Sequence, residues 1–305
     1  MKYFVKIIVF CFFFFLFDYL FSVLILNGLN KYYGIGTESE ILISGTSASI
    51  QGFDNNLVEL KTHKEVSNYS RAGASIYERY LMLNHFFRNT KFNGVVLYEI
   101  SPMMFSNKKI TDNSYKLFYP FMDDENINEY IASEANIIDY IIKRIIRTTR
   151  FEDEQLLVHS IRGYLNNQKN IKNLNIDINK FKNVDGKIGT ESIIIDKNKK
   201  DELLKSFDLI RSNYGYVFLV NMPLTKLKTE QYITKDYNDY LLFFKNISDS
   251  LSYVELIDFN IDHFVNNDFF SDLVHLNTKG QKIFSAAISD SLINSRFYSN
   301  INDTE

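Results

Sequence analysis

The stretch ILISGTSA, residues 41–48, gives the strongest indication of the fold. Its first part is a short apolar run that ends at Gly45, which is typical of a buried strand stopping at a loop at the carboxyl end of a parallel sheet. Ser47 follows at once, where a glycine permits a sharp turn and a hydroxyl can project above the sheet. Taken alone, a serine in such a place is more often a turn or helix-cap residue than a nucleophile.

The rest of the chain alternates between strand and helix patterns. We expect strands at residues 57–60, 66–69, 94–100, 216–220 and 253–259, and helices at residues 76–87, 232–250 and 278–292. This alternation predicts an α/β sandwich with a parallel sheet. Ligands of such sheets bind beyond the carboxyl ends of the strands, which is where Ser47 is expected to lie.

The bulk composition narrows the functional classes. Hydrophobic residues make up 46% and charged residues 23% of 305 residues, which is enough for a sizeable core. The net charge of -3 and the lack of any nucleic-acid signature argue against a nucleic-acid partner. Cys11 is the single cysteine, and the sequence contains no dense His/Asp/Glu cluster and no phosphate-binding glycine loop, so we expect no disulfide, metal or cofactor.

The N-terminal segment is long and apolar enough to cross a membrane. Residues 7–26 provide roughly the ~20 residues that a spanning helix needs. Lys2 and Lys6 precede them, so the positive-inside tendency places the N-terminus in the cytoplasm and the chain after Asn27 on the other side. The length and the missing Ala-x-Ala-like site favour an uncleaved anchor, residues 1–27, over a cleaved signal peptide, leaving residues 28–305 as the main domain. Asp18 is costly against lipid, so we expect it to face another protein helix or water, unless the helix sits shallow.

Residues from about 107 to 200 break the alternation and are predicted to form a helical insertion over the active edge of the sheet. Within it, isoleucines recur at helical spacing, and basic residues supply the other side of the helix: Ile137, Ile138, Ile141, Ile142, Ile145 and Ile146 against Lys143, Arg144, Arg147 and Arg150. We expect the apolar stripe to pack on the domain and the basic side to face solvent. The alternative is a helix that lies on a membrane or on a partner.

A second chemistry-bearing motif follows the last predicted strand. Asp272 precedes His275 by three residues, and the helix starter Thr278 comes soon after. A carboxylate at that spacing can fold back and orient the imidazole, so that its other nitrogen faces a serine, as a Ser-His-Asp triad requires. Histidine is the side chain suited to exchange a proton with serine near neutral pH. A structural loop or cap histidine is the alternative reading of His275.

Together, GTS at residues 45–47 and DLVH at residues 272–275 resemble the first and last blocks of the SGNH (GDSL-like) hydrolases. The resemblance implies a flavodoxin-like three-layer α/β/α sandwich and the catalytic residues Ser47, Asp272 and His275. NYSRAGAS at residues 68–75 resembles the second block, which implies that backbone N–H groups of Ser47 and Gly73 form an oxyanion hole. Two positions depart from the family: EISP at residues 99–102 replaces the third-block asparagine, and Thr46 replaces an aspartate.

The chain resembles one branch of this family, the membrane-anchored proteins that include DltD, AlgJ and AlgX. The likeness rests on these two departures, on the N-terminal anchor and on FFSDLVHLN at residues 269–277. That likeness implies a bacterial, single-pass inner-membrane esterase or O-acetyltransferase on the extracytoplasmic side, acting on an envelope or secreted polysaccharide beside a membrane-bound O-acyltransferase. One alternative is a non-catalytic module that binds such an acyltransferase or polymer through Asp18 and the basic side of residues 143–150, motivated by the missing asparagine. A secreted lipase or esterase is a further alternative.

Overall fold

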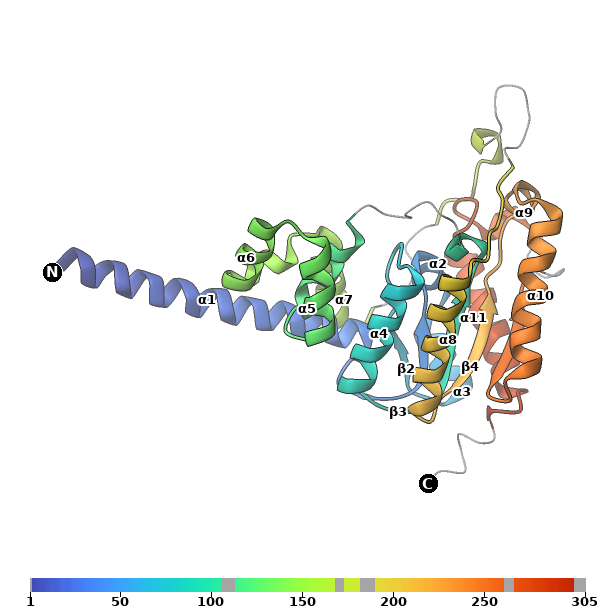
Figure 1. Ribbon diagram of the computed structural model, residues 1–305, viewed down its shortest axis with the longest axis horizontal. Helices are drawn as coiled ribbons and strands as arrows, with labels where there is room; N and C mark the ends of the chain where they lie inside the picture. Colours follow the sequence, from blue (N-terminus) through green and yellow to red (C-terminus); the bar gives the residue numbers. More distant parts are fainter. Residues whose placement is uncertain (1, 106–112, 168–172, 182–189, 261–265, 299–305) are drawn as a thin grey trace. The chain divides into compact units, whose positions relative to one another are not determined.

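The computed structural model describes residues 2–105, 113–167, 173–181, 190–260 and 266–298 (Figure 1). The chain divides into two compact units. A helical unit contains Met1–Ile35 and Thr111–Asn167, and a sheet unit contains Gly36–Ile110 and Gln168–Glu305. The expected insertion at residues 107–200 is therefore shared: its first part joins the N-terminal helix and its second part joins the sheet unit.

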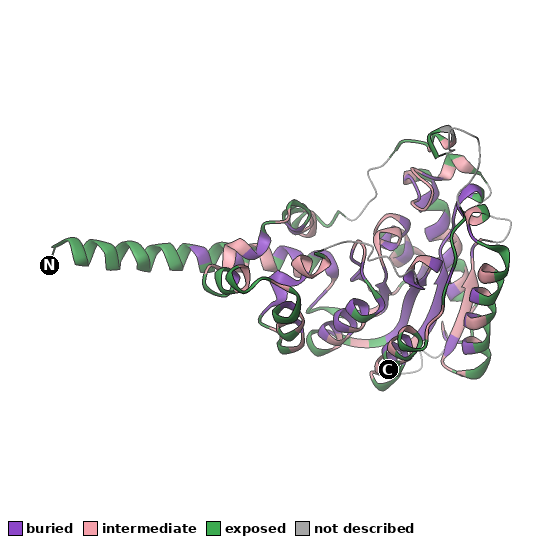
Figure 2. Cartoon of the chain, turned by 45° about the horizontal axis from the view of Figure 1, so that its top comes forward, coloured by how far each residue is buried: buried purple, intermediate pink, exposed green. Residues whose placement is uncertain are grey.

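The sheet unit is built on a five-stranded parallel sheet in the order β2-β1-β3-β4-β5. The strands are β1 (Glu38–Ser44), β2 (Val66–Asn68), β3 (Lys91–Ile100), β4 (Tyr216–Asn221) and β5 (Val254–Asp258). In β3 and β4 most residues are buried, as expected where helices cover both faces of a sheet (Figure 2). The predicted α/β fold with a parallel sheet is confirmed.

Helices cover both faces of this sheet. The α-helices of the unit are α2 (Ser47–Gly52), α3 (Asn55–Thr62), α4 (Ile76–Asn89), α8 (Lys197–Ser212), α9 (Lys226–Gln231), α10 (Thr234–Ser250) and α11 (Thr278–Ile293), with short 3-10 turns at η1 (Pro102–Phe105), η4 (Ile178–Phe181) and η5 (Asn267–Phe269). Ile43, Leu97 and Phe218 of three neighbouring strands share a buried cluster with Phe284 and Ile288 of α11. Because side chains alternate along a strand, Tyr98 points to the opposite face, where its ring meets Phe207 of α8 edge-on.

One expected strand was wrong. Residues 57–60 lie inside α3, because capping signals on both sides outweigh their short apolar run. The Asp54 side chain accepts a hydrogen bond from the backbone N–H of Leu57, and His63 ends the helix in the left-handed conformation with φ 53°. The other expected strands and helices correspond to β2, β3, β4, β5, α4, α10 and α11.

The helical unit is organised around α1 (Lys2–Tyr33), a single helix of 32 residues. Its other elements are η2 (Ser114–Phe121), α5 (Glu125–Glu134), α6 (Ile137–Ile145), η3 (Arg147–Phe151) and α7 (Glu154–Tyr164). The backbones of α1 and α7 approach closely, because a Cβ on Gly28 would collide with Ser160 and one on Gly163 would collide with the Gly28 carbonyl. The side chains of residues 2–17 of α1 are exposed (Figure 2).

The expected orientation of α6 was wrong. Its isoleucines are exposed, whereas Lys143 and Arg150 on the basic side are 2% and 4% exposed. Both cations find partners inside the unit: Lys143 Nζ lies 2.5 Å from Glu152 Oε2, and Arg150 Nη1, in η3, lies 3.2 Å from Asp123 Oδ2. Buried charges that are paired in this way are tolerated, so Lys143 of α6 can face inward, whereas the Arg144 side chain is 46% exposed.

Asp18 of α1 was expected to face another protein helix or water, and it binds η3, a short helix of its own chain. Its carboxylate accepts hydrogen bonds from the backbone N–H groups of Arg147 (2.7 Å) and Thr148 (2.9 Å) and from the Thr148 hydroxyl (2.5 Å). Asp18 therefore binds the first turn of η3 in its own chain, where unpaired N–H groups favour an anion.

Candidate active site

Ser47 occupies the turn between the first strand and the helix that follows it. Strand β1 ends at Ser44, and Ser47 is the first residue of α2. The Thr46 hydroxyl caps this helix by accepting a hydrogen bond from the backbone N–H of Ala48 at 3.3 Å. Gly45 has no room for a side chain, because a Cβ would collide with the Ser49 hydroxyl and the Glu99 carboxylate. The turn therefore depends on glycine, and it places Ser47 just past the carboxyl end of β1.

Asp272 and His275 lie on a tightly bonded loop just before α11. Oδ1 of Asp272 accepts hydrogen bonds from the backbone N–H groups of Val274 (3.0 Å) and His275 (2.9 Å). The carbonyl of Leu273 accepts one bond from the Thr225 backbone N–H at 3.2 Å and one from its hydroxyl at 3.0 Å. These bonds hold the carboxylate and the imidazole in place before any substrate binds.

The structure brings together the three residues that the sequence analysis predicted as a triad. Nε2 of His275 lies 2.8 Å from Ser47 Oγ, although the two residues are 228 positions apart. Nδ1 of the same ring lies 2.7 Å from Asp272 Oδ2. The His275 side chain is 19% exposed and that of Asp272 is 32% exposed, so the site is sheltered and still open to solvent. A hydroxyl, an imidazole and a carboxylate in this order can activate the hydroxyl as a nucleophile.

The electrostatics of Asp272 suit this arrangement. Burial by itself acts to raise the pKa of the Asp272 carboxyl, but the hydrogen bonds from the His275 ring and from the backbone N–H groups of Val274 and His275 outweigh it. Its pKa therefore lies below the ordinary value of 3.8, and the carboxylate is ionised at neutral pH. An ionised carboxylate on Nδ1 stabilises the positive charge that the ring gains when it takes a proton from serine.

Gly73, the second residue predicted for an oxyanion hole, lies in the loop between β2 and α4. The backbone N–H of Arg71 donates a 3.1 Å hydrogen bond to the Gly45 carbonyl, which ties this loop to the turn that carries Ser47. Gly73 has a φ of 70°, a left-handed conformation that favours glycine. The donor function of its N–H group stays a prediction.

Glu99 belongs to the site, although the sequence analysis noted it only as a departure from the family pattern. Its carboxylate accepts hydrogen bonds from the Thr46 backbone N–H at 2.6 Å and from the Ser49 hydroxyl at 2.7 Å. The Thr46 hydroxyl adds a bond of 2.8 Å. Glu99 thus binds residues on both sides of Ser47, and it is 1% exposed.

The buried charge of Glu99 is balanced by Arg79 of α4. The Arg79 guanidinium lies 3.7 Å from Glu99 Oε1 and donates a 2.5 Å hydrogen bond to the Glu99 carbonyl. Arg79 is also 1% exposed. A charged residue near the end of the buried run VVLYEI, residues 95–100, was the available sequence signal, because an unpaired buried carboxylate would be very costly.

Comparisons with known proteins add a likeness of structure. No protein-family model matches the chain, and a search of curated proteins finds no match. Among solved structures, a "putative acylhydrolase" from Bacteroides fragilis NCTC 9343 matches with a TM-score of 0.41 and 8% sequence identity, covering 87% of this chain and 88% of that chain. Among the described residues, no group of three or more His, Cys, Asp or Glu side chains could hold a metal ion. The functional conclusion therefore depends on the geometry of the site itself.

Proposed function

We propose that this chain is a membrane-anchored serine esterase or O-acyltransferase of the SGNH kind, with its catalytic domain outside the cytoplasm. The observation that supports it most directly is the unbroken hydrogen-bond relay from Ser47 through His275 to Asp272, with links of 2.8 and 2.7 Å. Each residue then has a defined function: Ser47 is the nucleophile, His275 the general base and acid, and Asp272 the group that orients and stabilises the ring.

The reaction proceeds in two transfers. Ser47 Oγ attacks the carbonyl carbon of an acyl ester while His275 Nε2 takes its proton. The tetrahedral intermediate then expels the alkoxide, which leaves as an alcohol with the proton from His275, and the acyl group stays on Ser47. In the second transfer a hydroxyl of the acceptor, or water, gives its proton to His275 and attacks the acyl-serine. The bond between the acyl carbon and Ser47 Oγ then breaks, and His275 returns the proton to Ser47 Oγ, which regenerates the free enzyme and releases the new ester or the acid.

Backbone N–H groups are the natural stabilisers of the intermediate's negative oxygen. Ser47 is the first residue of α2, so its N–H lies at the N-terminus of that helix. The loop that contains Gly73 is joined to the same turn by the hydrogen bond from the Arg71 N–H to the Gly45 carbonyl. Two such donors aimed at the oxyanion contribute several kcal/mol in comparable sites, about 2.7–4 for one donor. Glu99 supports these donors indirectly, because its carboxylate binds Thr46 and Ser49 on the two sides of Ser47.

The membrane anchor is the second part of the proposal. Helix α1 is long and apolar enough to cross a bilayer, a test that a signal sequence also passes. Its C-terminal half is an integral part of the helical unit: Leu29, Tyr32 and Tyr33 are buried, and Tyr32 stacks on His159 with ring centroids 4.2 Å apart. Cleavage after the apolar run would remove Asp18 from η3, so these contacts favour an anchor that remains attached.

An envelope or secreted glycopolymer is the substrate class that we favour, because of the resemblance to the anchored SGNH branch. In that case the acceptor or donor hydroxyl belongs to a sugar, and a membrane-bound O-acyltransferase supplies or shares the acyl group. The acyl group is proposed to be acetyl. Hydrolysis and transfer share the same acyl-serine, so the ratio of the two products with and without a carbohydrate acceptor distinguishes them.

A fluorophosphonate probe, which reacts covalently with activated serines, tests the proposal directly. The detergent-solubilised full chain should be labelled, and Ser47→Ala and His275→Ala should each abolish labelling while leaving the circular dichroism spectrum unchanged. Ser291→Ala on α11 is a matched control: the Ser291 hydroxyl donates to the Ala287 carbonyl of its own helix at 3.0 Å, and labelling should persist. A folded parent chain that is not labelled would contradict the proposal and favour the non-catalytic alternative.

That alternative keeps part of its expected contact surface. Asp18 is bound by η3, and Lys143 and Arg150 are buried within the helical unit. The side chains of Arg144 and Arg147 are 46% and 39% exposed, so these two are the basic residues that a partner acyltransferase or polymer would meet.

A further inference from the structure

Helix α6 presents an uncovered aliphatic side. Its nine residues carry five isoleucines whose exposed fractions lie between 42% and 67%: Ile137, Ile138, Ile141, Ile142 and Ile145. Of its two basic residues, Lys143 points inward to Glu152 and Asp139, whereas the Arg144 side chain is 46% exposed near the C-terminal end of the helix. A contiguous apolar patch of this kind marks a protein-contact or membrane-contact site.

The position of α6 along α1 is set by hydrogen bonds within the helical unit. Residue 146 alone separates α6 from η3, whose first turn is bound to Asp18. At 1.5 Å per residue, Asp18 lies about 12 Å along the helix axis from Leu26, where the apolar run ends. If residues 7–26 fill a hydrocarbon core about 30 Å thick, the start of η3 lies within its outer half, and α6 lies at membrane depth or at its boundary.

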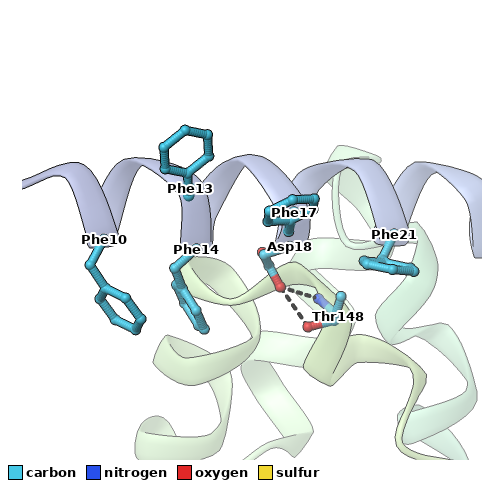
Figure 3. A pocket seen from close by; sticks show the side chains of 7 residues that line it. All are labelled: Phe10, Phe13, Phe14, Phe17, Asp18, Phe21 and Thr148. Carbon is cyan, nitrogen blue, oxygen red and sulfur yellow. Dashed lines mark hydrogen bonds between the residues drawn. The ribbon is translucent and has the colours of Figure 1, made fainter.

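A groove beside α1 also supports contact with lipid (Figure 3). It has a volume of about 420 Å³ and is lined by Phe10, Phe13, Phe14, Phe17, Asp18, Phe21 and Thr148. Its polar members, Asp18 and Thr148, already bond to each other, so the groove offers apolar contact surface and suits a hydrocarbon chain.

We propose that α6 is an interfacial membrane helix whose isoleucines insert into the outer leaflet of the bilayer that α1 crosses, with an acyl chain of a lipid in the groove beside Phe10 and Phe14. The inference rests on the proposed anchor, because the depth of α6 in the bilayer follows from the position of α1 across it. Lipid is favoured over a protein partner because Asp18 binds η3, one residue after α6, to the apolar run of α1. The buried pairing of Lys143 removes one charge that would oppose insertion. The exposed Arg144 has a long side chain that reaches the headgroup level.

The chain contains no tryptophan, so a single introduced tryptophan is a clean depth probe. Three full-length variants are reconstituted in phosphatidylcholine vesicles with or without brominated acyl chains, which quench tryptophan on contact. Ile141→Trp reports on α6. Phe13→Trp reports on the anchor at the same exposure, since both parent side chains are 47% exposed. Leu60→Trp on α3, where the parent side chain is 70% exposed, is the control in the sheet unit.

We expect brominated lipid to reduce the fluorescence of Ile141→Trp and Phe13→Trp at least twofold and to leave Leu60→Trp unchanged. Quenching at Phe13 without quenching at Ile141 would overturn the proposal for α6 and leave the anchor intact, and a protein partner would then be the better occupant. No quenching at Phe13 would overturn both, and quenching at Leu60 would indicate unspecific adsorption and overturn the assignment to α6. Fluorophosphonate labelling of the same samples reports on Ser47 separately, so failure of the catalytic proposal would be distinguishable.

Discussion

The carboxylate of Glu99 accepts a 2.6 Å hydrogen bond from the backbone N–H of Thr46, the residue immediately before Ser47. A second bond to the Ser49 hydroxyl holds the first turn of α2 from the other side. The serine that is proposed to react is therefore positioned by a carboxylate that does not belong to the relay. This relationship can be tested by substitution at each of its ends.

Glu99→Gln should destabilise the sheet unit and slow labelling of Ser47. The neutral side chain leaves Arg79 buried and uncompensated, which costs about 3–5 kcal/mol in comparable buried pairs. Denaturant unfolding in detergent measures the loss, and the labelling rate reports on the turn. Glu65→Gln, at an exposed position, should change neither quantity. Unchanged stability of Glu99→Gln would show that the pair does not support the turn.

Thr46→Val should lower the stability by about 1–2 kcal/mol and slow fluorophosphonate labelling, because it removes both the helix cap and a hydroxyl donor to Glu99. Thr46→Ser keeps the hydroxyl and should restore most of both. The comparison of the two rates separates positioning of Ser47 from a general loss of packing. If serine and valine behave alike, the hydroxyl does not contribute.

Gly45→Ala should destabilise the chain by about 1–3 kcal/mol, the usual cost of forcing atoms into a packed site. The added methyl would meet Ser49 and Glu99. Gly36→Ala is the contrasting variant: no atom lies within 4 Å of its Cβ position, although its φ of 86° carries its own strain. We expect Gly45→Ala to lose labelling and Gly36→Ala to keep it. Labelling that persists in Gly45→Ala would argue against a tight turn.

Acid should weaken the loop that carries the proposed base. The pKa of Asp272 is lower in the folded chain than in the unfolded chain, so its contribution to stability is present above the ordinary value of 3.8 and is lost as the pH falls through the lowered folded value. In Asp272→Asn this part of the acid dependence should disappear. The same variant should lose activity by about 10⁴-fold at neutral pH, as when the carboxylate of other triads is neutralised. Unfolding curves from pH 6 to 2 and ester turnover at pH 7 measure the two effects.

Asp18→Ala should loosen η3 without affecting labelling of Ser47. Three donors from Arg147 and Thr148 lose their acceptor, each at a cost of about 1–3 kcal/mol if it stays unpaired. Hydrogen exchange of the detergent-solubilised chain should be faster at residues 147–151 than in the parent. Asp249→Ala, whose carboxylate is exposed and pairs with Lys245, should leave the exchange of these residues unchanged. Identical exchange in Asp18→Ala and the parent would contradict this assignment.

The parallel sheet could be predicted from local rules, because buried strands read as apolar runs. Asp272 and His275 lie close enough along the chain to bond each other. Ser47, which lies 228 residues from His275, was predicted as their partner only through the resemblance of residues 45–47 and 272–275 to the SGNH blocks. The function of Glu99 could not be predicted in this way. It depends on the register of β1 and β3, in which Ser44 lies opposite Tyr98, so that Glu99 comes next to a turn 53 residues earlier.

The side of α6 that faces inward could not be predicted from the sequence, for a related reason. Periodicity identifies two sides of a helix and cannot tell which one meets the protein. Here the carboxylates of Glu152 and Asp123 lie where they can pair with Lys143 and Arg150, and this pairing turns the isoleucines outward.

The two units are interleaved along the chain, and this constrains the order in which a nascent chain can assemble. Helix α1 emerges first, but α7, against which it packs, follows more than a hundred residues later. Strand β3 likewise cannot pair with β4 until the whole of Thr111–Asn167 has been synthesised. Neither core can close during early synthesis, and β3, already paired with β1 on one side, keeps its other edge unpaired until β4 follows. An unpaired strand edge can associate with other chains, so the late synthesis of β4 exposes the nascent chain to aggregation.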